Sequence, residues 1–378
     1  MNFPIYLDYN ATTPVDERVF DAMKPFYMEH FGNAASSGHA FGDRAKSAVE
    51  SARATIANAI NASPEEIIFT SGATESNNLA IKGAYRMLAQ KGNHCITAPT
   101  EHKAVLDTCK SLEKEGVKTT FLSVDNDGNI NLSELADAID EHTFLVTLMH
   151  GNNEIGTLHD IQKIGECCRE KGVWFHTDST QTIGKIPFDV QIMLVDMASL
   201  TAHKIYGPKG VGALYVRKGC KVIPQIDGGG HESGMRSGTL NVPGIVGFAK
   251  AIEVAVSDME RDIAHCTHLR NRLWEFLKSL GCVTLNGPNP LTHPQNRLPN
   301  NLSVSISGDN GELIAGSLFN VAVSSRSACT SASSEPSHVL RSIGRTDSNL
   351  TTLRFGIGRM TTDEEIDYTI ECMRSAVE

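Results

Sequence analysis

Two stretches of the chain, HTDSTQTIGKIPFDV (residues 176–190) and SLTAHKIYGPKG (residues 199–210), decide the fold and the chemistry that it supports. They place an acid, Asp178, at the end of an apolar run and a lysine, Lys204, further along the chain, directly after His203. A lysine amine can form a Schiff base with an aldehyde, and a carboxylate can keep a pyridine nitrogen protonated. The two stretches therefore predict a site for pyridoxal phosphate. The alternative for Lys204 is an ordinary basic residue, one of 34.

Helical and strand-like patterns alternate around these stretches, from about residue 15 to residue 216. This alternation predicts an α/β fold with a mainly parallel sheet that helices cover on both faces. The predicted strands are residues 65–70, 94–100, 117–124, 143–150, 173–178, 193–203 and 211–217. The predicted helices are residues 16–31, 41–60, 71–90, 101–116 and 161–172, with a further helix from Leu132.

Polar residues follow several of these strands directly. Thr74 follows the strand EEIIFT, His102 follows HCITAPT, Asn153 follows TFLVTLMH, and Asp178 ends VWFHTD. Ligands of parallel α/β folds bind at the carboxyl ends of strands. We therefore expect these four residues, from separate segments, to meet in one site.

Each candidate residue has an interpretation as part of such a site and a second interpretation without a functional role. Small residues at 71–76, with the Thr74 hydroxyl, could hold a phosphate at a helix start or form an ordinary helix cap. The imidazole of His102 could stack on the pyridine ring and move protons, or simply be solvated. Gln181 could donate to the phenolic oxygen of the cofactor or be a surface amide. Thr201 and His203 are further candidate phosphate donors.

After residue 216 the sequence changes character. A helical region runs to about Leu280, an irregular segment rich in Pro and Asn covers residues 287–301, and short strands are predicted at 301–306, 321–325 and 352–358. We expect a large cofactor-binding domain at residues 15–256. Residues 1–14 and 257–378 would form a smaller α+β domain, with a cysteine-bearing loop at about 324–337.

Two segments of the second half carry further candidates. Cys329 stands among Ser, Thr and Ala residues, which predicts an exposed thiol, and Arg326 could lower its pKa. An incidental loop cysteine is the alternative. Arg354 ends a strand-like run and suits a carboxylate of the substrate or a structural ion pair. In the glycine-rich segment 228–241, Arg236 and Thr239 could serve a phosphate, or the segment could be only a tight turn.

Composition excludes several classes of protein. The net charge of −10 argues against direct nucleic-acid binding and against an anionic membrane. The 378 residues include no apolar run of transmembrane length and no signal-peptide pattern at the start, so we expect a cytoplasmic protein. The nine cysteines are odd in number, scattered and without a C-x-x-C pair, which predicts neither a disulfide framework nor a metal site.

The chain resembles the cysteine desulfurases, which are pyridoxal-phosphate enzymes of the class V aminotransferase group, from end to end. The resemblance rests on an ordered set of motifs, YLDYNATTPVD, FGNAAS, FTSGATESNNLAIKG, TEHKAVLDTC, HGNNEIG, HTDSTQTIGK, AHKIYGPKGVGALYV, GGGHESGMRSGTLN, SSRSACTSAS and LRFGIGR. It implies the aspartate aminotransferase-like fold type I, with a seven-stranded sheet in the large domain. The long cysteine loop is similar to that of the housekeeping iron–sulfur subgroup.

The resemblance implies a role for each candidate residue. Cys329, Lys204 and His102 would be catalytic, as sulfur acceptor, Schiff-base lysine and stacked proton shuttle. Asn153 would contact the cofactor and, with Arg354, hold the substrate carboxylate. The remaining cofactor contacts would be Ala73 through its backbone, Thr74, Thr201 and His203 at the phosphate, Asp178 at the pyridine nitrogen, Gln181 at the phenolic oxygen, and Thr239 at the phosphate of a neighbouring subunit in a homodimer.

The implied activity is conversion of L-cysteine to L-alanine, with a persulfide formed on Cys329 and its sulfur passed to an acceptor protein. The acceptor would serve iron–sulfur assembly, tRNA thiolation or DNA phosphorothioation. The chain stops at SAVE, without the C-terminal extension of housekeeping members, and Arg326 replaces the usual glycine, so we expect that a specialised acceptor is a serious possibility. A selenocysteine lyase-like enzyme and a noncatalytic assembly subunit of the same fold are the alternatives.

Overall fold

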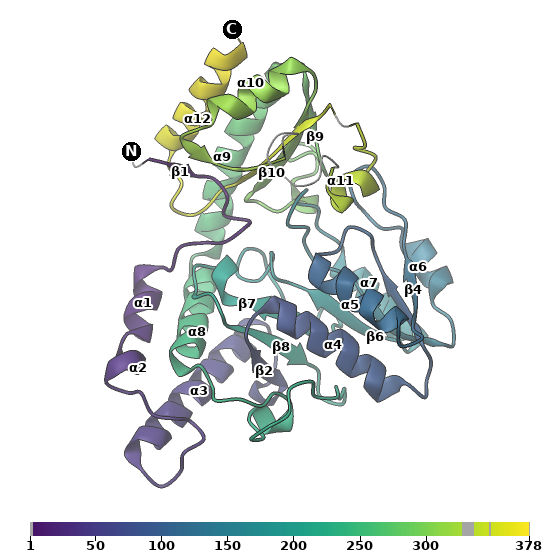
Figure 1. Ribbon diagram of the computed structural model, residues 1–378, viewed down its shortest axis with the longest axis vertical. Helices are drawn as coiled ribbons and strands as arrows, with labels where there is room; N and C mark the ends of the chain where they lie inside the picture. The colour runs from purple at the N-terminus through teal and green to yellow at the C-terminus, as the bar shows by residue number, and fades with distance from the viewer. Residues whose placement is uncertain (1–2, 327–335, 348, 378) are drawn as a thin grey trace.

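The computed structural model describes residues 3–326, 336–347 and 349–377, and its larger part is built on a seven-stranded sheet (Figure 1). The strand order is β2-β8-β7-β6-β5-β3-β4, and neighbours are parallel except where β8 pairs antiparallel with β2 and β7. The mainly parallel sheet of seven strands is thus confirmed. The strands are β2 (Ile67–Thr70), β3 (His94–Thr97), β4 (Lys118–Phe121), β5 (Thr143–Thr147), β6 (Trp174–Asp178), β7 (Met197–Thr201) and β8 (Gly212–Val216).

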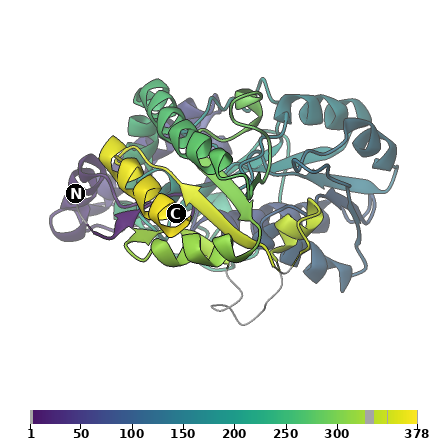
Figure 2. The same cartoon turned by 90° about the horizontal axis from the view of Figure 1, so that it is seen from above.

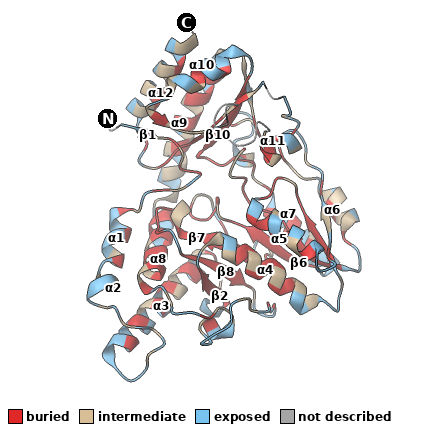
Figure 3. Cartoon of the chain, in the orientation of Figure 1, coloured by how far each residue is buried: buried red, intermediate tan, exposed pale blue. Residues whose placement is uncertain are grey.

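Helices cover both faces of this sheet, because successive strand residues point to opposite sides. In β8, Tyr215 belongs to one apolar core and its neighbour Leu214 to the other. Helices α3, α6, α7 and α8 pack on the first core and α4 and α5 on the second; Figure 3 shows their inner sides as buried. These helices are α3 (Ala40–Ala59), α4 (Ala73–Leu88), α5 (Lys103–Glu113), α6 (Leu132–Ala138), α7 (Ile161–Lys171) and α8 (Val242–Ser257).

The helix predicted at residues 16–31 is wrong in its extent. The segment forms two short helices, α1 (Glu17–Met23) and α2 (Pro25–Met28), and no helix continues to Phe31. Pro25 has no backbone N–H and its ring crowds the preceding turn, so a proline is tolerated at a helix start but not inside a helix. Pro25 accordingly stands at the first position of α2.

The smaller part contains a four-stranded antiparallel sheet in the order β12-β13-β10-β9. Its strands are β9 (Val283–Leu285), β10 (Asn301–Ile306), β12 (Ser324–Arg326) and β13 (Thr351–Gly356), and β9 was missed by the sequence analysis. Seen from above in Figure 2, helices lie across this sheet. They are α9 (Met259–Ser279), α10 (Asp309–Ser317) and α12 (Asp363–Val377), with the short α11 (His338–Ser342) beside the larger part.

The start of the chain belongs to the smaller part in space. Strand β1 (Ile5–Tyr6) pairs in parallel with β11 (Val321–Ala322), and Asp8 forms an isolated bridge with Gly356. Residues 9–13 then run from this sheet toward the large sheet, where Thr13 N donates to the carbonyl of His203. The N-terminal segment thus connects the sheets of the smaller part with the end of β7.

The outer edge of β2 is closed by two side chains. Arg53 of α3 donates to the carbonyl of Ile67, and Glu232 accepts from the backbone N–H of Phe69 at 2.7 Å. The guanidinium and carboxylate also pair with each other at 2.7 Å, and only 1% of the Glu232 side chain is exposed. Unpaired strand edges invite association with other strands, so this ion pair takes the place of a further strand.

Four short 3-10 helices complete the described elements: Pro64–Glu66, Ala202–Lys204, Glu232–Gly234 and Pro294–Asn296. Within the residues that the structure describes, no helix combines the length and apolar character needed to cross a bilayer.

Candidate active site

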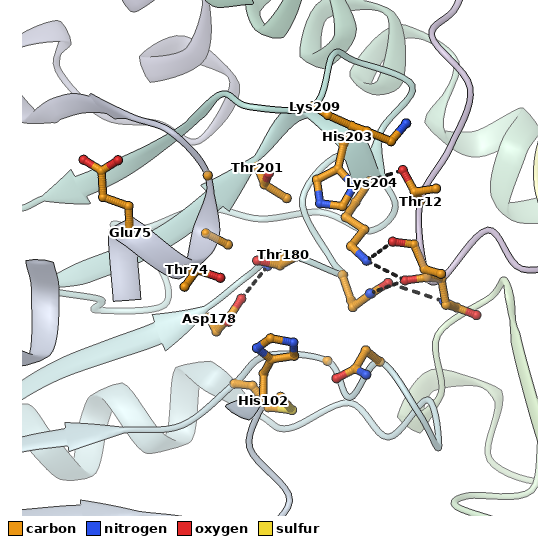
Figure 4. Close-up of a pocket in the computed structure, with 18 of the residues that line it drawn as sticks. Thr12, Thr74, Glu75, His102, Asp178, Thr180, Thr201, His203, Lys204 and Lys209 are labelled. Carbon is orange, nitrogen blue, oxygen red and sulfur yellow. Dashed lines mark hydrogen bonds between the residues drawn. The ribbon is translucent and has the colours of Figure 1, made fainter. Parts of the chain in front are cut away.

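A pocket of about 630 Å³ lies at the carboxyl ends of the strands of the large sheet (Figure 4). Ten of the residues expected at the site line it, and they come from both parts of the molecule. They are Ala73, Thr74, His102, Asn153, Asp178, Gln181, Thr201, His203, Lys204 and Arg354. The expectation that separate strand ends would meet in one site is therefore confirmed.

The start of α4 forms one wall of the pocket and is built to hold an anion. Gly72 precedes the helix with φ of 149° and without a side-chain cap, so the first N–H groups of α4 have no partner within the helix. A Cβ on Gly212 would lie 2.7 Å from the Gly72 Cα, so glycine there lets the two backbones meet. Thr74 and Thr201 add hydroxyls at this wall. A phosphate is the anion such a helix start accommodates best.

Asp178 ends β6 with its carboxylate held on two sides. Asn77 of α4 donates its Nδ2 to Oδ2 at 2.7 Å, and the backbone N–H of Thr180 donates to Oδ1 at 3.0 Å. Both bonds fix the orientation of the carboxylate at the end of β6. The side chain can therefore present a fixed negative charge to a protonated ring nitrogen.

Lys204 follows β7 in the short helix Ala202–Lys204 and turns its amine into the pocket. Its Nζ donates to the carbonyls of Asn10 at 2.7 Å and Ala11 at 2.5 Å. Burial, helped by the positive charge of Arg354, lowers the pKa of Lys204 to about 8. A sizeable fraction of the amine is then neutral near physiological pH, which is the form that attacks a carbonyl carbon.

The two histidines of the pocket are placed differently. Burial, together with the charges of Lys204 and Lys209, lowers the pKa of His203 to about 4, so its imidazole is neutral and shares a hydrogen bond of 3.1 Å with Thr12. His102 caps α5, and its Nδ1 accepts from the N–H of Ala104 at 3.1 Å. This bond leaves Nε2 of His102 free, and the exposed ring faces the pocket in Figure 4.

Gln181 is buried and forms a reciprocal pair with Asn10. Its Nε2 donates to the Asn10 carbonyl at 3.0 Å, and the Asn10 side chain donates back to Oε1 at 3.3 Å. Asn10 also accepts from Asn301 of β10 at 3.3 Å and so links the two parts of the molecule. The surface-amide alternative for Gln181 is excluded by its burial.

Arg354 of β13 enters the pocket from the smaller part. Its guanidinium donates to Asp8 and Ser324, each at 2.7 Å, and to the carbonyl of Asn153 at 3.0 Å. Its Nε is buried and has no partner among the described residues. Arg354 thus lines the pocket while it is in an ion pair, and its Nε donor is not used by any described residue.

These groups fit pyridoxal 5'-phosphate. The start of α4 offers donors for the phosphate, Asp178 offers an anion for the ring nitrogen, and Lys204 offers an amine for the aldehyde. Thr180, which lines the same pocket, has a buried hydroxyl oxygen without a partner in the described part of the chain. Buried polar atoms without a partner are rare in proteins, which is consistent with a ligand that completes the site.

Comparison with known proteins places the chain in a family. The Aminotransferase class-V family matches residues 5–369, and the chain belongs to it. It is 53% identical to "Cysteine desulfurase IscS" of Anaeromyxobacter sp. (strain Fw109-5), over 98% of this chain and 91% of that relative. Among solved structures, a "NifS-like protein" matches with a TM-score of 0.90 and 40% identity over 98% of each chain. "SspA in complex with cysteine" matches with a TM-score of 0.81 and 37% identity, over 95% of this chain and all of that one.

Four candidate residues are not placed at the pocket by the described structure. Thr239 is exposed and does not line it. Arg236 is engaged elsewhere, since its Nε donates to Glu75 at 2.8 Å. Cys329 lies outside the described residues, as does the side chain of Arg326, so their expected roles stay predictions.

Sequence reasoning missed three residues near the site. Asn10 and Thr12 line the pocket, and Lys185 donates to Gln181. The motif YLDYNATTPVD contains Asn10 and Thr12, but it lies far from the large sheet in sequence. The sequence does contain a signal for Lys185. This residue follows Gln181 by four residues, and this spacing puts two side chains on the same side of a helical turn.

Proposed function

We propose that the protein is a pyridoxal-phosphate-dependent cysteine desulfurase that converts L-cysteine to L-alanine and retains the sulfur on the enzyme. The observation that carries this proposal is the convergence of Lys204, Asp178 and the start of α4 on one pocket, with Arg354 entering from the other part of the molecule. The relative named cysteine desulfurase and the neighbour solved with cysteine support the choice of reaction and substrate.

The proposed cofactor contacts follow from the groups available. Ala73, through its N–H, and Thr74, Thr201 and His203 would hold the phosphate, and Asp178 the ring nitrogen. Gln181 would donate to the phenolic oxygen, and Asn153 and His102 would lie against the ring. When bound, pyridoxal phosphate supplies an electron sink for charge that develops on the substrate α-carbon.

Lys204 would take the α-proton of the substrate, for which its lowered pKa suits it. Arg354 and Asn153 would hold the substrate carboxylate, because a guanidinium fork matches the two carboxylate oxygens. His102 would move a proton at its Nε2, the nitrogen that its bond to Ala104 leaves free.

Cys329 would accept the sulfur. Its thiolate would attack the substrate sulfur, so that an S–S bond forms while the carbon–sulfur bond breaks and leaves its electron pair on the substrate carbon. Protonation of that carbon and return of the α-proton from Lys204 would complete L-alanine, and Cys329 would keep a persulfide. The described ends of its segment lie beside pocket residues, which supports this role. Ser324 donates to Asp8, the ion-pair partner of Arg354, at 2.8 Å. His338 shares a hydrogen bond of 2.9 Å with the carbonyl of Glu101, the residue before His102.

The test measures L-alanine and enzyme-bound persulfide formed from L-cysteine by the wild type and by Cys329→Ser. We expect both products from the wild type, and from the variant no persulfide at position 329 and little L-alanine. Alanine formation from L-selenocysteine alone would instead support the lyase alternative. Failure to bind the cofactor or form either product would support the noncatalytic subunit.

The partners are a further part of the proposal. We infer a cytoplasmic homodimer in which exposed Thr239 reaches the phosphate of the neighbouring subunit. A sulfur-acceptor protein would take the persulfide from Cys329. Capture of the tagged protein with mass spectrometry of the bound chains distinguishes an iron–sulfur scaffold from components of tRNA thiolation or DNA phosphorothioation, and light scattering distinguishes a dimer from a monomer.

A further inference from the structure

Lys185 is a lysine beside the pocket that the proposed reaction does not use. It lies in the turn after β6, and its Nζ is 3.3 Å from Oε1 of Gln181. Burial is the main cause that lowers its pKa, to about 7. Lys185 also lines a small cavity of about 30 Å³ behind Lys204, whose other walls include Tyr206, Asp262, Cys266 and Arg359. Burying an ammonium costs free energy, so we expect a contact that compensates for the burial of Lys185.

That contact is the hydrogen bond that Lys185 donates. Its Nζ donates to Oε1 of Gln181 at 3.3 Å, so this contact favours the orientation of the amide in which the oxygen faces Lys185. The side chain of Asn10 favours the same orientation of the amide, because its Nδ2 donates to the same oxygen at 3.3 Å. Two independent donors therefore determine which way round the Gln181 amide lies.

This orientation decides what Gln181 can offer to the pocket. With Oε1 held by Lys185 and Asn10, the amide presents Nε2 on the other side, where one hydrogen is donated to the Asn10 carbonyl at 3.0 Å. An amide nitrogen carries two hydrogens, so the second remains available to an acceptor. If the amide were reversed, its oxygen would face the Asn10 carbonyl and any anionic ligand atom, and both contacts would be repulsive.

We propose that Lys185 is a positioning residue, which acts through Gln181 by fixing its amide so that Nε2 donates to the phenolic oxygen of pyridoxal phosphate. The inference rests on the proposed function, which places that oxygen beside Gln181. Lys185 itself touches neither the cofactor nor the substrate in this scheme.

A merely structural or long-range electrostatic role makes a different prediction. A positive charge near the pocket would act on the cofactor whether or not Gln181 had an amide, whereas a positioning role requires that amide. A double-mutant cycle between positions 185 and 181 separates the two, because coupling appears only if one residue acts through the other.

The experiment uses three variants. Lys185→Met keeps the approximate length of the side chain and removes the hydrogen-bond donors, whereas Lys185→Arg keeps donors at this position. Gln181→Met removes the amide. Each apoprotein is titrated with pyridoxal phosphate, and the dissociation constant and absorbance maximum of the bound cofactor are measured. Lys278→Met, at an exposed position on α9, is the control for loss of one positive charge. Thermal unfolding of each apoprotein verifies folding, and Lys185→Gln is a second variant if the methionine variant does not fold.

We expect Lys185→Met to raise the dissociation constant about tenfold, the change that corresponds to loss of one well-placed hydrogen bond, and to shift the absorbance maximum. Lys185→Arg and Lys278→Met should resemble the wild type. In the Gln181→Met background, Lys185→Met should change the dissociation constant less than about twofold.

Two results would overturn the inference. One is an unchanged cofactor constant and spectrum in both Lys185→Met and Lys185→Gln while Gln181→Met alters them. The other is an effect of Lys185→Met that is as large without the Gln181 amide as with it. If Gln181→Met itself changes nothing, the proposed contact of Gln181 fails together with the inference, whereas failure of the wild type to bind the cofactor refutes the proposed function.

Discussion

Asp8 and Arg354 form an ion pair of 2.7 Å across the pocket rim, between the N-terminal segment and strand β13. The sequence left two roles open for Arg354, a substrate carboxylate contact and a structural ion pair. The geometry accommodates both, because the guanidinium fork has more donors than Asp8 occupies and its Nε has no partner in the described chain.

We predict that Arg354→Lys raises KM for L-cysteine by about 10- to 100-fold, because a lysine keeps the charge but loses the fork that binds a carboxylate with two parallel bonds. The turnover number should change less. Steady-state alanine formation measures both constants, with Arg374→Lys on the exposed face of α12 as the control. An unchanged KM would leave Arg354 with the structural role alone.

The pH dependence of cofactor uptake tests the environment of Lys204. The pKa of its amine in the apoprotein is lowered from 10.5 to about 8, and only the neutral amine attacks an aldehyde. The uptake rate should therefore rise about tenfold per pH unit below pH 8 and level off above it. Stopped-flow absorbance on the apoprotein measures this rate. A rise that continues to pH 10 would mean that burial does not perturb the amine.

Replacing Gly72 by alanine should weaken cofactor binding. The residue has φ of 149°, a conformation that side chains other than glycine avoid, at a strain of about 1–3 kcal/mol. The variant relieves this strain by moving the start of α4, where the phosphate would bind. Gly116→Ala is the matched control, since Gly116 has φ of 93° in a turn outside the pocket. Both variants should unfold at lower denaturant, but only Gly72→Ala should raise the cofactor dissociation constant.

Glu232→Ala should lower the free energy of unfolding by about 3–5 kcal/mol, because it removes the buried carboxylate that pairs with Arg53, leaves the exposed Glu50 as its remaining anion, and uncovers the edge of β2. Urea unfolding of the apoprotein measures this change. Glu253→Ala removes the partner of Lys250 in an exposed pair and should change stability by less than about 1 kcal/mol. Equal effects of the two substitutions would show that the edge contact contributes no more than a surface ion pair.

The sequence was sufficient for the parts of the fold that local patterns encode. Buried parallel strands are continuous apolar runs, so the position of β6 before Asp178 and of β7 before Lys204 could be predicted. Polar residues directly after such strands must lie at one edge of the sheet. That geometric rule is why Asp178 and Thr74 were correctly expected in one pocket.

Contacts made by distant segments could not be predicted in this way. Asn10 contacts Lys204 from a segment that follows β1, and the two residues of β1 carry no pattern that predicts their pairing with β11. Strand β9 has three residues, which is too short for a period to be recognised. Lys185 resembles an exposed lysine in sequence, and its role depends on which atom of Gln181 faces it.

The dependence of Lys204 on the carbonyls of Asn10 and Ala11 has a consequence for cofactor capture. These carbonyls lie in the N-terminal segment, yet β11 and Gly356, which pair with that segment, lie near the other end of the sequence. The amine of Lys204 is thus held by a contact between segments that are distant in sequence. A substitution that weakens the pairing of β1 with β11 is therefore expected to disturb capture of the vitamin-derived cofactor at Lys204.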